Sequence, residues 1–256
     1  MKALVPPLLR CERLSQSFGG IVAVSDLSLE VEAGELVGLI GPNGAGKTTT
    51  LRLMAGIQPP KAGQIYFGAA NVTRLATVNR VRMGFATTHQ IVRPLRNLSV
   101  IENVMLAAGS ARTASAVRSL FQFSKSIEER KARGLLERLG LSAVADKEPG
   151  ILPLGQLKRL EVARALALDP KIVVLDEPLA GLNQREASTI ADLIVDLNRD
   201  GLTIILIEHN LSEVLRICRR LLVLDAGSII ANGDPQTVMA QQNVRTAYLG
   251  DQIDAA

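Results

Sequence analysis

An eight-residue glycine-rich segment constrains the fold of this chain more tightly than any other feature. It follows the pattern G-x-x-x-x-G-K-[ST] in full and reads Gly41-Pro42-Asn43-Gly44-Ala45-Gly46-Lys47-Thr48. The glycines allow the backbone to curl so that successive N–H groups point inward at phosphate oxygens. The pattern therefore predicts a loop that holds phosphates, in which Lys47 reaches the β- and γ-phosphates and the Thr48 hydroxyl binds Mg²⁺.

The sequence on either side of this loop supports the same prediction. Residues 36–40 have the pattern of a short buried strand, and residues 48–55 have the pattern of a helix, whose positive N-terminal end would face the loop. An accidental match to the loop pattern is expected in about 1% of chains of this length, given ordinary glycine usage. We therefore expect nucleotide binding, with Thr49 joining the loop residues in the contacts.

A hydrophobic strand that ends in two carboxylates forms the second element of the predicted site. The segment 171–177 reads Lys-Ile-Val-Val-Leu-Asp-Glu. Asp176 comes first after the strand, so we expect it to hold Mg²⁺ directly or through water. Glu177 is then free to orient and deprotonate the attacking water as a general base. The alternative interpretation, a solvated strand end, loses weight beside the phosphate loop.

The order of the remaining elements indicates an α/β fold with a mainly parallel sheet. Strand patterns at 171–175, 202–207 and 220–224 alternate with helical patterns at 185–198 and 211–218. Residues 89–165 have a mainly helical character and read as an insertion. We therefore expect one nucleotide-binding domain, with an α/β core from 1–88 and 166–256 and a helical subdomain from 89–165.

Composition and charge exclude several classes of protein. The longest apolar runs, such as 172–175, are far shorter than the roughly 18 to 20 residues that span a bilayer, and no secretory signal is visible, so we expect a cytosolic location. The formal charge of +4 is modest and dispersed, and it does not require nucleic acid as a partner. Cys11 and Cys218 stand in no metal-binding motif, which favours two buried, reduced thiols.

Further motifs occur in an order that resembles the ATP-binding cassette (ABC) family. The segment 152–156, Leu-Pro-Leu-Gly-Gln, precedes the carboxylate strand where this family carries its LSGGQ signature. Gly155 and Gln156 match the signature, whereas Pro153 and Leu154 replace the usual Ser and Gly. The resemblance implies that two copies sit head to tail, with each signature facing the γ-phosphate held by the other copy. Loss of the Ser hydroxyl removes one side-chain contact but leaves the backbone N–H groups.

Four more positions match family motifs. Gln90 corresponds to the Q-loop glutamine, which is expected to sense Mg²⁺ and water, and His209 to the switch histidine, which is expected to bind the γ-phosphate. Asn183 stands where the D-loop usually has Asp. Phe18, 29 residues before Lys47, resembles the aromatic residue that stacks on adenine. Taken alone, Gln90 would be an ordinary loop residue, His209 a structural or surface histidine, and Phe18 a core residue.

The resemblance spans roughly residues 8–250 and implies a P-loop NTPase core of the RecA-like type. To the mainly parallel sheet it adds a helical ABC signature subdomain and N-terminal antiparallel strands. Five segments look most like ATPase subunits of LIV-type uptake systems for branched-chain amino acids. They are Phe-Gly-Gly at 18–20, the segment from Gln90 to Glu102, Ala-Gly-Leu-Asn at 180–183, Glu-His-Asn at 208–210, and the ending from Ala-Asn-Gly at 231–233 to Ala-Tyr-Leu-Gly at 247–250. The family identifies solutes mainly through other subunits, so this step rests on analogy.

The implied function is hydrolysis of ATP, with Mg²⁺, to drive an ABC importer from the inner face of the cell membrane. Expected partners are the membrane subunits, a second ATP-binding subunit that is identical or related, and indirectly a periplasmic or extracellular solute-binding protein. Two alternatives stay open: an ATPase of lipid or lipopolysaccharide export, and a soluble ABC ATPase that acts on nucleic acid. The latter usually carries a long coiled-coil insertion or two fused cassettes, which this chain lacks.

The segment 90–103 is a candidate for contact with the membrane subunits. It has loop punctuation at Pro94 and Asn97, yet it carries more apolar residues than a solvated loop needs, namely Ile91, Val92, Leu95 and Leu98. These residues either pack the helical insertion or line a groove for a short helix of the membrane subunit, edged by Arg93 and Arg96.

Overall fold

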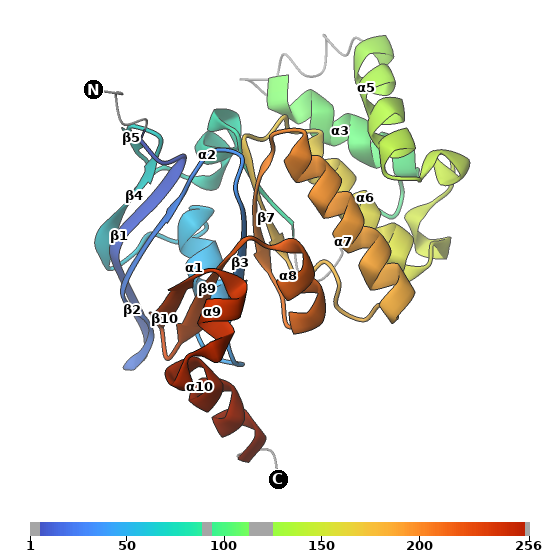
Figure 1. The fold of residues 1–256 in the computed structure, drawn as a ribbon. Helices are drawn as coiled ribbons and strands as arrows, with labels where there is room; N and C mark the ends of the chain where they lie inside the picture. Colours follow the sequence, from blue (N-terminus) through green and yellow to red (C-terminus); the bar gives the residue numbers. More distant parts are fainter. Residues whose placement is uncertain (1–5, 89–93, 113–124, 254–256) are drawn as a thin grey trace, which may run out of the picture.

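Two sheets organise the chain, as Figure 1 shows for the computed structural model, which describes residues 6–88, 94–112 and 125–253. A four-stranded antiparallel sheet has the order β2-β1-β4-β5, and a six-stranded sheet has the order β10-β9-β3-β8-β7-β6. The antiparallel sheet comprises β1 (Leu9–Phe18), β2 (Ile21–Val31), β4 (Ala62–Phe67) and β5 (Ala70–Asn71). The six-stranded sheet comprises β3 (Leu36–Ile40), β6 (Phe85–Thr87), β7 (Ile172–Asp176), β8 (Thr203–Ile207), β9 (Arg220–Asp225) and β10 (Ser228–Gly233).

The larger sheet is parallel except at one edge. Strands β9, β3, β8, β7 and β6 pair in parallel, and β10 pairs antiparallel with β9. Parallel neighbours need crossover connections, which the helices supply. The predicted α/β fold with a mainly parallel sheet and N-terminal antiparallel strands is confirmed.

The central strands are buried on both faces, which explains their continuous apolar sequence. Every residue of β3, β7 and β8 is buried. Alternate side chains point to opposite faces, so Val173 joins one hydrophobic cluster with α6, α7 and α8, while Val174 joins another with α1 and the antiparallel sheet. Helix α1 therefore lies between the two sheets (Figure 1).

The helices fall into three groups along the chain. Near the N-terminal sheet lie α1 (Lys47–Met54) and α2 (Thr77–Met83). Between β6 and β7 lie α3 (Val100–Arg112), α5 (Lys125–Arg138), α6 (Leu154–Leu166) and the short 3₁₀ turns η1 (Ser142–Val144) and η2 (Pro149–Ile151). The C-terminal group comprises α7 (Gln184–Arg199), α8 (Leu211–Ile217), α9 (Pro235–Ala240) and α10 (Gln242–Ile253). Within the described ranges, no helix combines the length and the apolar character that a membrane span requires.

Both cysteines lie inside the protein as free thiols. Cys11 belongs to β1 and Cys218 follows α8, and each is buried. Burial disfavours the thiolate and raises the pKa of each thiol to about 12. The expectation of two buried, reduced thiols agrees with this environment, since a thiol with so high a pKa is a poor nucleophile.

One buried arginine fixes the C-terminal end of α1. Arg80 of α2 is 2% exposed, and its Nη1 donates to the carbonyl oxygens of Leu53 and Met54 at 2.7 and 2.6 Å. Its other guanidinium nitrogens donate to the carbonyls of Leu75 and Thr73. The bond to Met54 satisfies a carbonyl that the end of a helix leaves without an intrahelical partner, and the bond to Leu53 adds to the one from the Gly56 N–H. Arg80 thus joins the helix that follows the phosphate loop to the segment after β5.

Replacement of this arginine should destabilise the fold strongly. Arg80→Met keeps most of the apolar stem but leaves several buried carbonyls without donors, so the free energy of unfolding should fall by about 3 kcal/mol. Urea unfolding followed by circular dichroism measures the change. The matched control is Arg82→Met on the same helix, where the side chain is exposed and a change within about 0.5 kcal/mol is expected. Equal losses in both variants would contradict the role of Arg80.

Candidate active site

The phosphate loop connects β3 to α1 and requires glycine at two positions. Gly41 has φ 154° and Gly46 has φ 103°, in the region that side chains disfavour. A Cβ at Gly41 would lie 2.0 Å from the Leu224 carbonyl oxygen, and one at Gly46 would lie 2.3 Å from the Ala23 carbonyl oxygen. The loop is therefore wedged between β2 and β9, and the two flanking glycines of the motif are required by sterics.

Lys47 directs its ammonium back into this loop. The side chain is buried, and its Nζ donates to the carbonyl oxygens of Gly41 and Pro42 at 2.6 and 2.9 Å. Helix α1 begins at Lys47 without a side-chain cap and without an acidic residue in its first turn. Thr48 is exposed and Thr49 half-buried on that turn. A cation and the positive end of a helix thus meet in one place, which suits a polyanion.

The two carboxylates leave β7 at the same edge of the sheet. Asp176 is 6% exposed, and its backbone N–H donates to the Thr88 hydroxyl at 3.0 Å. Asp176 pairs in register with Ile207 of β8, and Ile207 pairs with Leu39 of β3. The carboxyl ends of these three parallel strands therefore lie side by side, where α/β folds place their ligands.

Glu177 and His209 face each other across this edge. The Glu177 Oε1 lies 2.9 Å from the His209 Nε2. Glu177 has φ 49°, a left-handed conformation that is uncommon for a residue with a side chain. Its N–H donates to the Ile207 carbonyl at 2.9 Å. The structure thus brings together two residues that lie 32 positions apart in the sequence.

The segment that resembles the signature starts helix α6. Pro153 precedes the helix, Leu154 begins it, and α6 has neither a side-chain cap nor an acidic residue in its first turn. Gly155 is buried, and the Oε1 of Gln156 is buried without a hydrogen-bond partner in the described part of the chain. Helices α7, α8 and α9, in contrast, are capped by Asn183, Asn210 and Asp234.

Leu154 is matched to a glycine in the segment after β7. A Cβ at Gly181 would lie 3.0 Å from the Leu154 Cδ2, and Gly181 has a φ of 79°. The larger side chain at position 154 therefore sits where residue 181 has none.

Asn183 caps α7 within its own chain, because its Oδ1 accepts the Glu186 N–H at 3.0 Å in a capping box.

Phe18 lies at the end of β1 with its side chain 47% exposed. Its alternative interpretation as a core residue is therefore wrong. The β1–β2 hairpin also borders the loop, since the Ala23 carbonyl of β2 lies against Gly46. Gln90 falls outside the described residues, so its predicted role stays a prediction.

Comparisons with known proteins agree with this geometry. The family model described as ABC transporter matches residues 24–180, which is more than half of the chain. This chain belongs to the ABC transporter family. It is an ATPase of that family and carries the ATP-binding cassette fold.

Relatives and solved structures resemble the cassette over nearly its full length. The high-affinity branched-chain amino acid transport ATP-binding protein LivG of Salmonella typhimurium is 38% identical, over 96% of this chain and 98% of that protein. The lipopolysaccharide export system ATP-binding protein LptB of Acidithiobacillus ferridurans is 37% identical, over the same shares. The ADP conformation of MJ1267, an ATP-binding cassette of an ABC transporter, is 32% identical with a TM-score of 0.84, over 95% of this chain and 98% of that one.

Two buried charges near Glu177 and His209 were not predicted from the sequence. Glu208 is 2% exposed, and its carboxylate accepts the N–H groups of Leu179 at 2.6 Å and His209 at 3.1 Å. Lys158 of α6 is 6% exposed, and its Nζ donates to the Glu177 carbonyl oxygen at 2.7 Å. Burial raises the pKa of Glu208 and lowers the pKa of Lys158. Glu208 stands in the Glu-His-Asn segment at 208–210, but no local pattern marks the buried contacts of either residue, because these depend on long-range packing.

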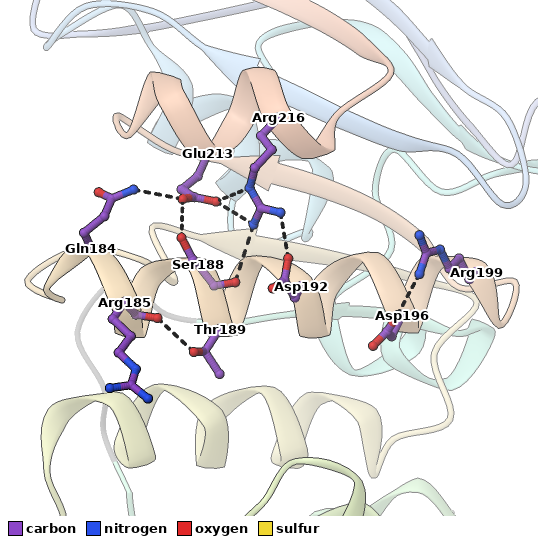
Figure 2. A network of polar contacts seen from close by, with 9 residues as sticks. All are labelled: Gln184, Arg185, Ser188, Thr189, Asp192, Asp196, Arg199, Glu213 and Arg216. Atoms are coloured by element: carbon purple, nitrogen blue, oxygen red, sulfur yellow. Dashed lines mark hydrogen bonds and ion pairs between the residues drawn. The ribbon is translucent and has the colours of Figure 1, made fainter.

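A third unpredicted charge joins the helices that follow the D-loop segment and His209 (Figure 2). Glu213 of α8 is 2% exposed and accepts hydrogen bonds from the Gln184 Nε2 at 3.1 Å and the Ser188 Oγ at 2.7 Å, both on α7. Arg216 donates to Glu213 at 2.8 Å and to Asp192 of α7 at 2.7 Å. These hydrogen bonds raise the pKa of Arg216. The network fixes α8, and with it the start of the His209 segment, against α7.

Loss of the central carboxylate should loosen this junction. Glu213→Ala leaves Gln184 and Ser188 without their acceptor and deprives Arg216 of one partner, so we expect a loss of about 2 to 3 kcal/mol in the free energy of unfolding. The control is Asp196→Ala on α7, which breaks the exposed ion pair with Arg199 and should change stability by less than about 0.5 kcal/mol. Chemical denaturation measures the free energy of unfolding of both variants. An equally small loss in both would show that the network around Glu213 is dispensable.

Proposed function

We propose that this ATPase hydrolyses ATP with Glu177 as the general base and energises an ABC importer of branched-chain amino acids or related small solutes. The hydrolytic part rests on one observation: Glu177 and His209 meet at 2.9 Å on the sheet edge from which the phosphate loop also starts. The solute rests on the similarity to LivG together with the LIV-type motifs of the sequence.

The phosphates of ATP are held by the loop and the start of α1. Residues 41–46 and Thr49 contribute backbone and side-chain donors, and the Lys47 ammonium binds the β- and γ-phosphates in place of the Gly41 and Pro42 carbonyls. Phe18 stacks on adenine from the adjacent hairpin. The assignment of Phe18 is supported by its exposure and by the contact of β2 with Gly46.

The residues present fit Mg²⁺ that arrives with the nucleotide. Magnesium usually takes one or two carboxylates together with phosphates and water. The described residues hold no group of three His, Cys, Asp or Glu side chains suited to a metal ion, whereas Asp176 and the Thr48 hydroxyl supply the few oxygens that Mg²⁺–ATP requires. We propose these two residues and Gln90 as its protein contacts. The bound ion neutralises charge on the phosphates.

Hydrolysis then requires a base and a correctly placed water. The Glu177 carboxylate takes a proton from water as the water oxygen bonds to the γ-phosphorus and the bond to ADP breaks. The His209 Nε2 orients this carboxylate and, with a small movement, contacts the γ-phosphate. Both side chains are positioned by the ends of neighbouring strands.

A second ATP-binding subunit completes each site. The uncapped start of α6 suits the γ-phosphate bound to the partner, through the Gly155 N–H with Gln156 beside it. The Gln156 N–H itself donates to the Pro153 carbonyl at 3.0 Å. Beside it, Ile151 is 70% exposed and Leu154 is 41% exposed. Exposed apolar side chains at a predicted interface support a head-to-tail dimer.

The membrane subunits are proposed to dock beside α3. Asn103 is 1% exposed, and its Nδ2 donates to the carbonyls of Leu95, Leu98 and Ser99 while its Oδ1 accepts the Leu95 N–H. These bonds fix the loop before α3 so that the Leu95 side chain stays 42% exposed. A fixed loop with an exposed leucine favours docking over internal packing.

Location, domain organisation and further partners are proposed as the family resemblance implies them. The cassette acts at the inner face of the cell membrane, with an α/β core from 1–88 and 166–256 and a signature subdomain from 89–165. A solute-binding protein acts only through the membrane subunits, and nucleic acid is not a partner. Lipopolysaccharide export is the second candidate function, because the similarity to LptB is nearly as high as that to LivG.

Glu177→Gln should separate binding from hydrolysis. The amide cannot accept the proton, so turnover should fall by at least about 100-fold while ATP is still bound and the ATP-bound dimer accumulates. Phosphate release and size-exclusion chromatography with ATP and Mg²⁺ measure the two effects. Lys47→Ala is the control, because loss of the ammonium should abolish hydrolysis and also weaken ATP binding greatly. Wild-type turnover in Glu177→Gln would rule out the assigned base.

Transport by the complete complex tests both the solute and the docking surface. Deletion of the gene should reduce uptake of labelled leucine, and the wild-type gene should restore it. Leu95→Asp should fail to restore uptake although the purified subunit hydrolyses ATP at near wild-type rate, since a charge enters an apolar contact. Leu215→Asp on α8, at another exposed leucine, should restore uptake.

Two results would contradict these proposals. Normal leucine uptake after deletion, combined with loss of lipopolysaccharide from the cell surface, would favour the export function. Full uptake with Leu95→Asp would instead place the docking surface elsewhere, and a loss of folding in that variant would indicate that Leu95 packs the helical region.

A further inference from the structure

We propose that Lys158 is a positioning residue that holds the Glu177 backbone in its catalytic conformation and links it to the signature helix of the same subunit. The inference rests on the proposed role of Glu177 as the base. It assigns a function to a residue that lies outside every motif recognised in the sequence.

The contact joins two elements with separate tasks. Lys158 lies on α6, about one turn after Leu154 at the start of that helix, and its Nζ donates to the Glu177 carbonyl at 2.7 Å. The side chain is 6% exposed, so water does not compete for this bond. A charge-assisted hydrogen bond in such a dry place is stronger than a neutral one.

The bond acts on a residue whose backbone needs support. Glu177 has φ 49°, and non-glycine residues keep such conformations only where their surroundings impose them. Its N–H donates to the Ile207 carbonyl at 2.9 Å. Its carbonyl accepts the short bond from the Lys158 Nζ at 2.7 Å and a longer one from the Ala180 N–H at 3.3 Å. With both ends of the residue fixed, the side chain is directed at the His209 Nε2. Loss of Lys158 would leave the carbonyl end with only the longer bond from the Ala180 N–H.

The surrounding acids explain why a cation occupies this position. Lys158 interacts electrostatically with Glu208, Asp176 and Glu161 as well as Glu177. Glu208 is itself buried and holds the N–H groups of Leu179 and His209. The ammonium therefore balances carboxylates that arise from β7, β8 and α6, and it keeps the strand ends that carry Glu177 and His209 together.

This link has a consequence in a head-to-tail dimer. The start of α6 faces the nucleotide held by the partner, whereas Glu177 serves the nucleotide held by its own subunit. Lys158 connects the two over a single side chain. When the start of α6 binds the partner's nucleotide, any resulting movement of α6 is passed through Lys158 to Glu177 of the same subunit. No long chain of contacts is needed.

Steady-state kinetics of the purified subunit test the positioning role. Lys158→Met keeps the length of the stem and removes the ammonium, so kcat should fall by at least tenfold while KM for ATP changes less than threefold. Lys158→Arg keeps a cation and should recover most of the lost kcat. The matched control is Lys131→Met, because the Lys131 Nζ donates to the Ala167 carbonyl at 2.7 Å at the far end of α6. That variant should keep wild-type kcat.

The outcomes separate this inference from the assignment of Glu177. A kcat for Lys158→Met within twofold of that for Lys131→Met would overturn the inference, even where Glu177→Gln abolishes turnover. Wild-type turnover in Glu177→Gln would overturn the assignment of Glu177 as the base, whatever the result for Lys158. Should Lys158→Met fail to fold, Lys158→Gln retains a donor without the charge, and wild-type kcat in that folded variant would also overturn the proposal.

Mixed dimers of two differently tagged copies test which site depends on the lysine. In one dimer, Lys158→Met is combined with a Glu177→Gln partner, so that the only competent base belongs to the lysine variant. In the other, both changes are in the same copy, and the competent base belongs to a wild-type copy. Relative to a dimer with a single Glu177→Gln, only the first should lose turnover. Loss confined to the second would overturn the claim that Lys158 acts on its own subunit's base.

Discussion

Parallel pairing of β3, β8 and β7 is the constraint on which the site depends. Asp176 pairs with Ile207, and Ile207 pairs with Leu39, so the three strands end at one level. The phosphate loop, Glu177 and His209 each follow one of these ends. A shift of one residue in register would exchange the two faces of a strand and move its apolar side chains between the two hydrophobic clusters. The burial of the strands therefore also fixes the spacing of the proposed catalytic groups.

The site is built from features that do not favour stability on their own. The starts of α1 and α6 lack side-chain caps, Glu177 has an unfavourable φ, and Glu208 and Lys158 are buried charges. The opposite choices appear elsewhere, with a side-chain cap from Asp234 at α9 and the satisfied carbonyls around Arg80. A missing cap is not confined to the site, because α2 also starts without one. The proposed roles of these helix starts in phosphate binding and of Glu177 as the base require that neighbouring elements hold them in place.

Local patterns predicted the parts of the site that depend on local geometry. The glycine pattern around Lys47, the apolar runs of the strands and the carboxylates after β7 each constrain neighbouring residues, so their structures follow from the sequence. Lys158 and Glu177 are 19 positions apart, and Arg80 and Leu53 are 27 apart, and such contacts leave no periodic signal. The substitution at Leu154 is understandable only beside Gly181. Phe18 needed the fold to show that its ring is exposed.

Similarity to an importer ATPase and to an exporter ATPase at almost the same level has a physical explanation. The residues around the loop, Glu177 and His209 are proposed to recognise phosphate and water, and that chemistry is independent of the transported molecule. Transport specificity must therefore be read on surfaces that contact other subunits. The loop before α3 has the properties of such a surface, because Asn103 fixes its backbone while Leu95 faces outward. A rigid backbone lowers the entropic cost of docking, so we expect changes in its exposed side chains to alter partner choice without disturbing ATP hydrolysis.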